Sequence, residues 1–236
     1  MKKEVEHFSD DDIDAISPGE EFNYFLPVID GVSKYTGKVD FALDIGCGNG
    51  VFSNTLKRFI PCKLYGIDGS EYALSKARQY DFDRLEKIED FSNDVLPFRD
   101  SEFDFIMCKD VLEHLINPKN LANEIQRTLK SSGFLLVHVP NHFPLYGRLQ
   151  LLFFNNIDPF RYFPKSKRWN FPHIRFYTKE SVLDLFSEFE LLEEFHEHFF
   201  HFPIASKFLS NNFKRKLSHK YTDLFSEGIT LLLKKK

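Results

Sequence analysis

The sequence has few cysteines and no long apolar run. Of its 236 residues, three are cysteines, at positions 47, 62 and 108. An odd, scattered set does not suit a disulfide framework and is typical of a reducing compartment. No apolar run approaches the roughly 20 residues of a membrane-spanning helix, and the charged start MKKEVEHFSDDDID lacks the apolar core of a signal peptide. We therefore expect a cytoplasmic protein.

The sequence also lacks an excess of basic charge, with 31 Lys and Arg against 35 Asp and Glu. Because a nucleic-acid-binding domain is usually net basic, nucleic acid is not an expected partner. Phenylalanine, by contrast, is frequent at 28 residues and is concentrated after residue 140. The length suits one α/β domain with a moderate insertion and is short for two full domains.

Short apolar runs alternate with helical patterns over the first two thirds of the chain. Such βαβ alternation predicts a mostly parallel sheet with right-handed crossovers. A further helix and two late strands follow. The predicted strands are 41–45, 63–67, 86–90, 103–108, 133–139, 190–196 and 228–233, and the predicted helices are 20–35, 49–59, 70–80, 118–130 and 178–187.

We expect a single domain over residues 1–236, with a polar N-terminal lead at 1–18 and two insertions. Residues 141–177, rich in Phe, Tyr, Pro and Asn, predict an inserted cap or lid, and residues 197–225 a helical, basic insertion on the substrate side. Within the cap, 145–157 has apolar residues at helical spacing. That stripe could pack on the sheet, cover an apolar acceptor, or lie at a membrane surface to reach lipid-linked substrates.

The most informative segment is FALDIGCGNG at 41–50, an apolar run followed by Gly46, Gly48 and Gly50. Glycines allow a sharp turn and a close approach of the backbone to a ligand. Free N–H groups at the start of the next helix would face that ligand. The pattern favours an adenosine-type cofactor over a tight turn alone. A dinucleotide fingerprint needs a small residue at its sixth position, where this chain has Val51.

Asp68 ends the second predicted strand. A carboxylate at this point can accept hydrogen bonds from both ribose hydroxyls, which supports adenosine binding without selecting the cofactor. Gly69 and Ser70 are expected to line the same rim.

Five ordered segments over roughly residues 40–180 resemble the class I S-adenosylmethionine-dependent methyltransferases, and in particular their small UbiE/UbiG-like and MetW-like group. The resemblance implies a Rossmann-like, doubly wound sheet of seven strands with the last one antiparallel, and S-adenosyl-L-methionine as the cofactor. The segments are ALDIGCGNG (42–50), YGIDGS (65–70), IEDFSNDVLPFRDSEFDFIMCKDVLEHL (88–115), NPKNLANEIQRTLKSSGFLLVHVPN (117–141) and HIRFYT (173–178).

The same resemblance assigns parts of the cofactor to residues of this chain. Asp44 would hold the amino group, and the turn at Gly46, Cys47, Gly48 and Gly50 would follow the carboxypropyl tail. The adenine would lie at Asp90 and the backbone N–H of Phe91, with Asp94 as the alternative acid. Lys109 and Asp110 would lie beneath the methionine moiety.

Two histidines are candidates for a general base. His142 follows the last parallel strand, and His114 belongs to VLEHL. A neutral imidazole can accept the proton of a hydroxyl acceptor near pH 7; His114 could instead order its loop. His196, His198 and His201 have no acid or cysteine placed with them, so no metal is expected.

The expected function is S-adenosylmethionine-dependent O-methylation of a small molecule, a glycan or a lipid-linked intermediate. The expected partner is a small-molecule or glycan acceptor, and peripheral membrane contact is less favoured. Two alternatives remain: a non-catalytic cofactor-binding or scaffold protein on the same fold, and an NAD-dependent enzyme.

Overall fold

The fold was analysed in a computed structural model, which describes residues 20–154, 173–195, 209–226 and 228–236. Its centre is a seven-stranded sheet with strand order β3-β2-β1-β4-β5-β7-β6. The strands are β1 (Phe41–Ile45), β2 (Lys63–Asp68), β3 (Arg84–Lys87), β4 (Phe103–Lys109), β5 (Leu129–Pro140), β6 (Phe189–Phe195) and β7 (Gly228–Lys235).

Strands β1 to β5 pair in parallel, and β7 pairs antiparallel with both β5 and β6. The last strand in sequence therefore runs against the other six, which confirms the predicted Rossmann-like topology. The strand order reverses between β1 and β4, because β2 and β3 lie on one side of β1 and β4 on the other. In open α/β sheets, ligands bind at the carboxyl ends of the strands at such a point.

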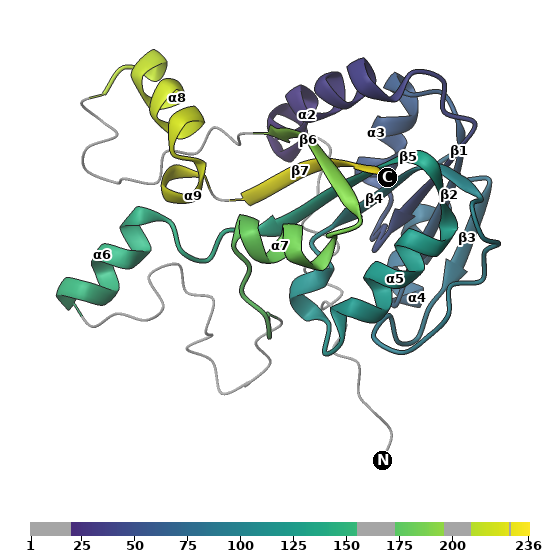
Figure 1. The fold of residues 1–236 in the computed structure, drawn as a ribbon. Helices are drawn as coiled ribbons and strands as arrows, with labels where there is room; N and C mark the ends of the chain where they lie inside the picture. The colour runs from purple at the N-terminus through teal and green to yellow at the C-terminus, as the bar shows by residue number, and fades with distance from the viewer. Residues whose placement is uncertain (1–19, 155–172, 196–208, 227) are drawn as a thin grey trace.

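Helices cover both faces of the sheet (Figure 1). Helices α5 (Pro118–Thr128) and α7 (Lys179–Leu185) supply apolar side chains to one core cluster, which also contains Leu43 and Ile45 of β1. Helices α2 (Glu20–Thr36) and α3 (Val51–Phe59) supply the second cluster, which contains Ala42 of the same strand. Successive residues of a strand point to opposite faces, so β1 is buried from both sides. Helix α4 (Glu71–Ala77) joins β2 to β3.

Some element boundaries differ from the sequence prediction. The helix predicted at 49–59 begins at Val51, because Gly48 and Gly50 adopt left-handed φ angles of 52° and 82°. The strand predicted at 86–90 lies at Arg84–Lys87, and the following residues turn rather than continue the ladder.

The predicted lead at 1–18 lies outside the described residues. Of the predicted insertions, the structure describes residues 141–154, 173–177 and 209–225, which include α6 (Leu145–Phe154), α8 (Asn211–Lys220) and α9 (Thr222–Phe225). Figure 1 shows these three helices together, on the side of the molecule where β7 begins. The described part of the segment 197–225 thus contains helices, as the sequence predicts.

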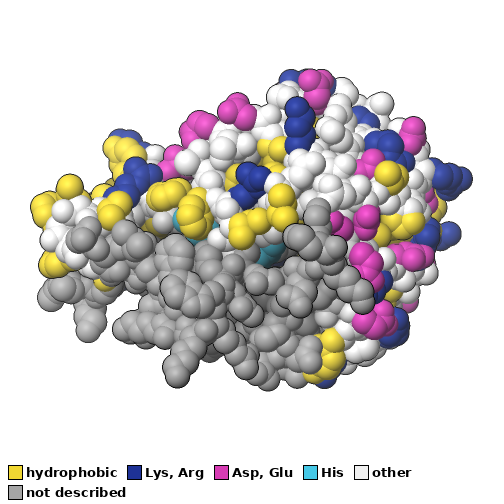
Figure 2. All heavy atoms as spheres, turned by 90° about the horizontal axis from the view of Figure 1, so that it is seen from below, with side chains coloured by type: hydrophobic (Ala, Val, Ile, Leu, Met, Phe, Trp, Pro, Cys, Tyr) yellow, Lys and Arg dark blue, Asp and Glu magenta, His cyan; other side chains and the backbone are white. Residues whose placement is uncertain are grey.

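Helix α6 does not bury the apolar stripe that the sequence predicts. Gly147 is its one buried residue among those described, and Leu152, Phe153 and Phe154 are 72%, 69% and 71% exposed. Figure 2 shows hydrophobic side chains gathered at the end of the molecule where α6 lies. Packing of this stripe on the sheet is therefore wrong for Leu152 and Phe153, whereas Leu145 and Leu149 are half-buried. None of the described helices has the length and apolar character that crossing a bilayer requires.

Candidate functional site

The glycine turn after β1 forms a cradle against the loop that follows β4. Gly46, Gly48 and Gly50 all adopt left-handed φ angles, of 72°, 52° and 82°, which favour glycine. The N–H groups of Gly46 and Cys47 both donate to the carbonyl oxygen of Ile67, at 2.8 and 3.0 Å. A Cβ atom on Gly46 would lie 2.3 Å from Cγ2 of Val111. This close approach leaves no room for a side chain at Gly46.

Asp68 ends β2 directly beside this turn. Its Oδ2 accepts a hydrogen bond from the N–H of Gly48 at 2.9 Å, and its Oδ1 accepts one from the N–H of Ser70 at 2.8 Å. Ser70 also caps α4 by accepting from the N–H of Ala73. The structure thus brings the glycine turn, Asp68, Gly69 and Ser70 together at one point of the sheet edge, as the sequence predicts.

Asp44 lies beneath the turn and is 3% exposed. Burial raises the pKa of its carboxyl group to about 7, while a hydrogen bond from the Ser53 hydroxyl opposes that rise. Sequence reasoning missed Ser53. The available signal was its place in the first turn of α3, where it is fully buried against the sheet.

The raised pKa of Asp44 predicts pH-dependent cofactor binding. With a folded-state pKa of about 7, roughly a tenth of the carboxyl group is ionised at pH 6 and most of it at pH 7.5. If the ionised form attracts the cofactor's ammonium group, S-adenosylmethionine should bind roughly tenfold more weakly at pH 6 than at pH 7.5. Calorimetric titration at both pH values measures this ratio.

Two controls isolate Asp44 as the cause. 5′-Methylthioadenosine lacks the amino-acid tail, so its affinity should change little over the same pH range. The Ser53→Ala variant loses the hydrogen bond that lowers the pKa of Asp44. As the pH is lowered, its affinity for S-adenosylmethionine should therefore begin to fall at a higher pH than that of the wild type. Equal pH dependence for both ligands would contradict the role of Asp44.

The loop after β3 holds both candidate acids for the adenine. Asp90 accepts hydrogen bonds from the N–H of Ser92 and the side chain of Asn93, at 2.9 and 2.7 Å. Asp94 accepts from the N–H of Asp90 at 2.9 Å. Phe91 lies between them, half-buried. The carboxylates thus share one tight turn, and the contribution of Asp90, Phe91 or Asp94 to adenine binding stays a prediction.

Lys109 and Asp110 end β4 in a charged, partly buried group. Asp110 adopts a left-handed φ of 55° and accepts at Oδ1 from Nδ1 of His138, 2.6 Å away. The Lys109 ammonium pairs with Asp110 and lies 4.7 Å from the centre of the Phe52 ring. The charges of His138 and Lys109 hold the pKa of Asp110 well below its usual range despite burial. His138 therefore positions Asp110, a role that its place inside a strand did not reveal.

Cys47 is buried at 6% exposure, and burial raises the pKa of its thiol. The side chain is therefore a neutral thiol at physiological pH. We therefore expect Cys47 to contact the cofactor through its backbone and not through its thiol.

The histidines of the site gather beside the 3-10 helix η1 (Leu112–His114) that follows β4. Nε2 of His142 lies 2.9 Å from Nδ1 of His173, and the rings of His114 and His173 are 4.9 Å apart between centres. Burial lowers the pKa of both His142 and His173 to about 4. The structure thus brings the two candidate bases, His114 and His142, together around His173. His196, His198 and His201 lie outside the described residues.

Glu113 is a buried acid that sequence reasoning did not single out. Its side chain is fully buried, and its carbonyl oxygen accepts from the N–H groups of Ile174 and Arg175 at 2.9 and 3.1 Å. These bonds tie the start of the HIRFYT segment to η1. The available signal was an acid beside a histidine directly after a buried strand.

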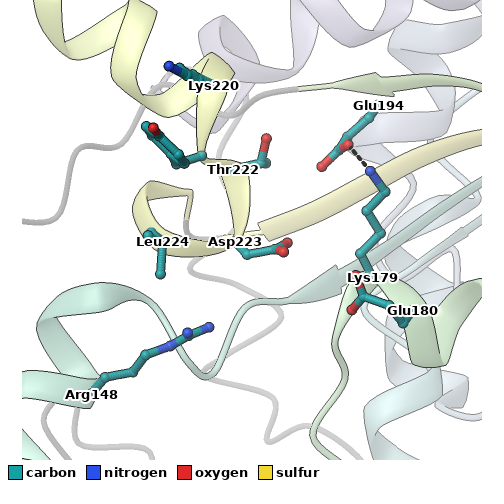
Figure 3. Close-up of a pocket in the computed structure, with 9 residues that line it drawn as sticks. Arg148, Lys179, Glu180, Glu194, Lys220, Thr222, Asp223 and Leu224 are labelled. Atoms are coloured by element: carbon teal, nitrogen blue, oxygen red, sulfur yellow. Dashed lines mark hydrogen bonds and ion pairs between the residues drawn. The ribbon is translucent and has the colours of Figure 1, made fainter.

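A polar cavity of about 510 Å³ opens near the carboxyl end of β5 (Figure 3). Part of its wall comes from α9, just before β7, whose first residue Gly228 pairs with Pro140 at the end of β5. One ion pair, Lys179 to Glu194 at 2.5 Å, crosses its wall. The lining residues are Arg148, Lys179, Glu180, Glu194, Lys220, Tyr221, Thr222, Asp223 and Leu224.

These features define a Rossmann-like domain with a site for a nucleoside-containing cofactor. A left-handed glycine cradle, an acid at the end of β2 and a buried acid in β1 fit the adenosine and amino-acid parts of S-adenosylmethionine. Residues 43–137 match the family model of the methyltransferase domain. Residues 43–137 therefore form a domain of the S-adenosylmethionine-dependent methyltransferase type, and S-adenosylmethionine is the cofactor that such a domain uses.

Curated relatives resemble this chain over the cofactor-binding half. The ubiquinone biosynthesis O-methyltransferase of Glaesserella parasuis is 33% identical over 106 residues, 42% of this chain and 44% of that protein. The sterol 24-C-methyltransferase of Schizosaccharomyces pombe is 31% identical over 100 residues, 41% of this chain and 26% of that protein. The chain thus spans less than half of these relatives.

A crystal structure of an S-adenosylmethionine-dependent methyltransferase from Archaeoglobus fulgidus has the same fold. It superposes with a TM-score of 0.63 at 20% identity, covering 92% of this chain and 95% of that one. At this identity the likeness concerns the fold alone.

Proposed function

We propose that this protein methylates an oxygen atom of a small polar acceptor, a small molecule or a glycan. The observation that carries the proposal is the polar cavity whose wall includes α9, just before β7. Its wall carries three cationic and three acidic side chains, of Arg148, Lys179, Lys220, Glu180, Glu194 and Asp223. Such a wall suits hydrogen-bonding groups better than an apolar chain.

The residues of the cofactor site would act by positioning. S-adenosylmethionine, when bound, supplies a methyl group on a positively charged sulfur. Asp68 would hold the ribose and Asp44 the amino group, and the glycine turn would fix the depth of the cofactor. Holding two reactants in line removes several kcal/mol of the barrier without any further chemistry. The group of Lys109, Asp110 and His138 would shape the floor beneath the methionine moiety.

A hydroxyl acceptor must lose a proton, and we expect His142 or His114 to accept it. Both side chains are partly exposed and lie on either side of His173. Replacing the base with alanine should lower kcat by about 100-fold or more with the cofactor Kd unchanged. Single-turnover rates and calorimetry on His142→Ala, His114→Ala and the double variant measure both quantities. Full turnover by the double variant would rule out base catalysis by these histidines.

The acceptor itself is tested by a panel assay with radiolabelled cofactor. Sugars, hydroxylated aromatics and hydroxy acids form the polar set, and the same head groups on isoprenoid chains in vesicles form the lipid-linked set. We expect methylation of the polar set, with a higher KM in the Arg148→Ala and Lys220→Ala variants. Methylation restricted to the lipid-linked set, or a methylated carbon or nitrogen, would contradict the proposal.

One observation favours lipid-linked acceptors as the second candidate. The exposed apolar end of α6, from Leu151 to Phe154, follows the exposed Arg148 on the same helix. An apolar helix face with a basic flank is a feature of interfacial helices. The sterol and ubiquinone names of the relatives also belong to apolar acceptors. A non-catalytic role would show as cofactor binding without methylation of any acceptor.

A further inference from the structure

Four titratable side chains meet beside η1, outside the contacts assigned to the cofactor. Glu113, His114 and His173 each offer a ligand atom, and these three atoms lie within 4.8 Å of one another. His142 contacts the group through His173. The residues come from two segments, the loop after β4 and the start of the segment before α7, which backbone hydrogen bonds from Ile174 and Arg175 to Glu113 join.

The Glu113 carboxylate is the key observation. Its side chain is 0% exposed, and within the described part of the chain neither carboxylate oxygen has a hydrogen-bond partner. A bare carboxylate in a protein interior costs several kcal/mol, so the group must carry a proton or face a cation. Nε2 of His114 lies 3.9 Å from Oε1 of Glu113, beyond hydrogen-bonding distance.

The histidines have the chemistry of metal ligands. A neutral imidazole offers a lone pair to a metal ion, and His173 lies half-buried beside Glu113 and His114. Nδ1 of His173 lies 2.9 Å from Nε2 of His142, so coordination through Nε2 of His173 would keep this contact. A second group that bonds the other ring nitrogen is the usual support of a metal-bound histidine.

We propose that Glu113, His114 and His173 bind a divalent transition-metal ion of the zinc type, with His142 orienting His173. With the ion bound, His114 is a ligand, and His142 alone remains the candidate base of the proposed function. Two imidazoles and one carboxylate are a known zinc ligand set, and three protein ligands leave one position open for water. Ligand atoms around tetrahedral zinc lie roughly 3.4 Å apart. The two segments are already joined by backbone hydrogen bonds, so side-chain rotation alone must bring the ligand atoms closer.

The test is metal binding by the full chain, with any affinity tag removed and bound metal stripped by a chelator. Zn²⁺ is titrated by calorimetry, and Co²⁺ by the visible absorption that a tetrahedral site produces. We expect one ion per chain with micromolar or tighter affinity. Glu113→Gln and His173→Gln should each weaken binding by about 100-fold or more, and His142→Gln by about 10- to 100-fold.

Controls separate a metal site from a protonated acid. His138→Gln removes an imidazole outside the cluster and should leave Zn²⁺ affinity unchanged. Glu113→Gln keeps the shape and neutrality of a protonated carboxyl group, so it should fold, which circular dichroism checks. No Zn²⁺ or Co²⁺ binding by the wild type, or wild-type affinity in both Glu113→Gln and His173→Gln, would overturn the proposal and identify Glu113 as a protonated structural acid.

Discussion

Replacing Asp68 with asparagine is expected to weaken S-adenosylmethionine binding by about 100-fold or more. A carboxylate that accepts two ribose hydroxyl hydrogen bonds contributes roughly 1.5 to 3 kcal/mol through each. The same oxygens accept the N–H groups of Gly48 and Ser70. Asparagine offers one acceptor oxygen, so it cannot satisfy both sides of the site. Calorimetric titration of wild type and variant gives the ratio of Kd values.

The matched control is Glu71→Gln, three residues further along the chain. Glu71 is paired with Arg78 at 2.7 Å, with both side chains 58% exposed. Loss of this exposed pair should leave the cofactor Kd unchanged, because such pairs contribute little. An Asp68→Asn variant that is folded and binds within threefold of the wild type would show that the ribose is held elsewhere.

Replacing Gly46 with alanine is expected to destabilise the fold strongly. The left-handed φ of 72° costs an alanine about 1 to 2 kcal/mol, and its Cβ would lie 2.3 Å from Cγ2 of Val111. A total loss of about 3 kcal/mol corresponds to a fall in Tm of roughly 6 to 12 °C for a chain of this size. Cofactor binding should fall as well, since the loop must move to relieve the contact. Thermal unfolding of the cofactor-free protein measures the first effect.

Two further variants separate backbone strain from the steric contact. Gly48→Ala has a left-handed φ of 52° but nothing within 4 Å of the added Cβ, so it should lose only the strain. The double variant Gly46→Ala with Val111→Ala removes the contact and should be more stable than expected from the sum of its single changes. If Gly46→Ala and Gly48→Ala unfold at the same temperature, the steric contact with Val111 does not contribute to the loss of stability.

Much of the cofactor half follows from local patterns. An apolar run, a glycine turn and an acid at the end of the next strand predict a nucleotide site because each is encoded over a few adjacent residues. The direction of β7 was expected from the family resemblance and was confirmed. The exact start of α3 was not predicted, because it depends on the φ angles of Gly48 and Gly50, which the sequence permits without specifying.

Features that join distant segments could not be predicted in the same way. The pairing of His138 with Asp110 joins neighbouring strands β4 and β5 across 28 positions. The cluster of Glu113, His114 and His173 forms only when the segment at 173–175 bonds to η1. Histidine spacing in the sequence drew attention to positions 196–201 as the one place to consider a metal. The cluster that we propose as a metal site lies far from those positions in sequence.

The sequence by itself determined the class of fold and an adenosine-binding site, because strand periodicity, the glycine turn and Asp68 act through neighbouring residues. The choice of S-adenosylmethionine as the cofactor came from the family resemblance of five ordered segments. Only the tertiary structure decided which side chains are buried, which acids lack a partner and where α6 exposes its apolar residues. Burial and pairing arise when distant segments pack, and desolvation then raises the pKa of groups such as Asp44.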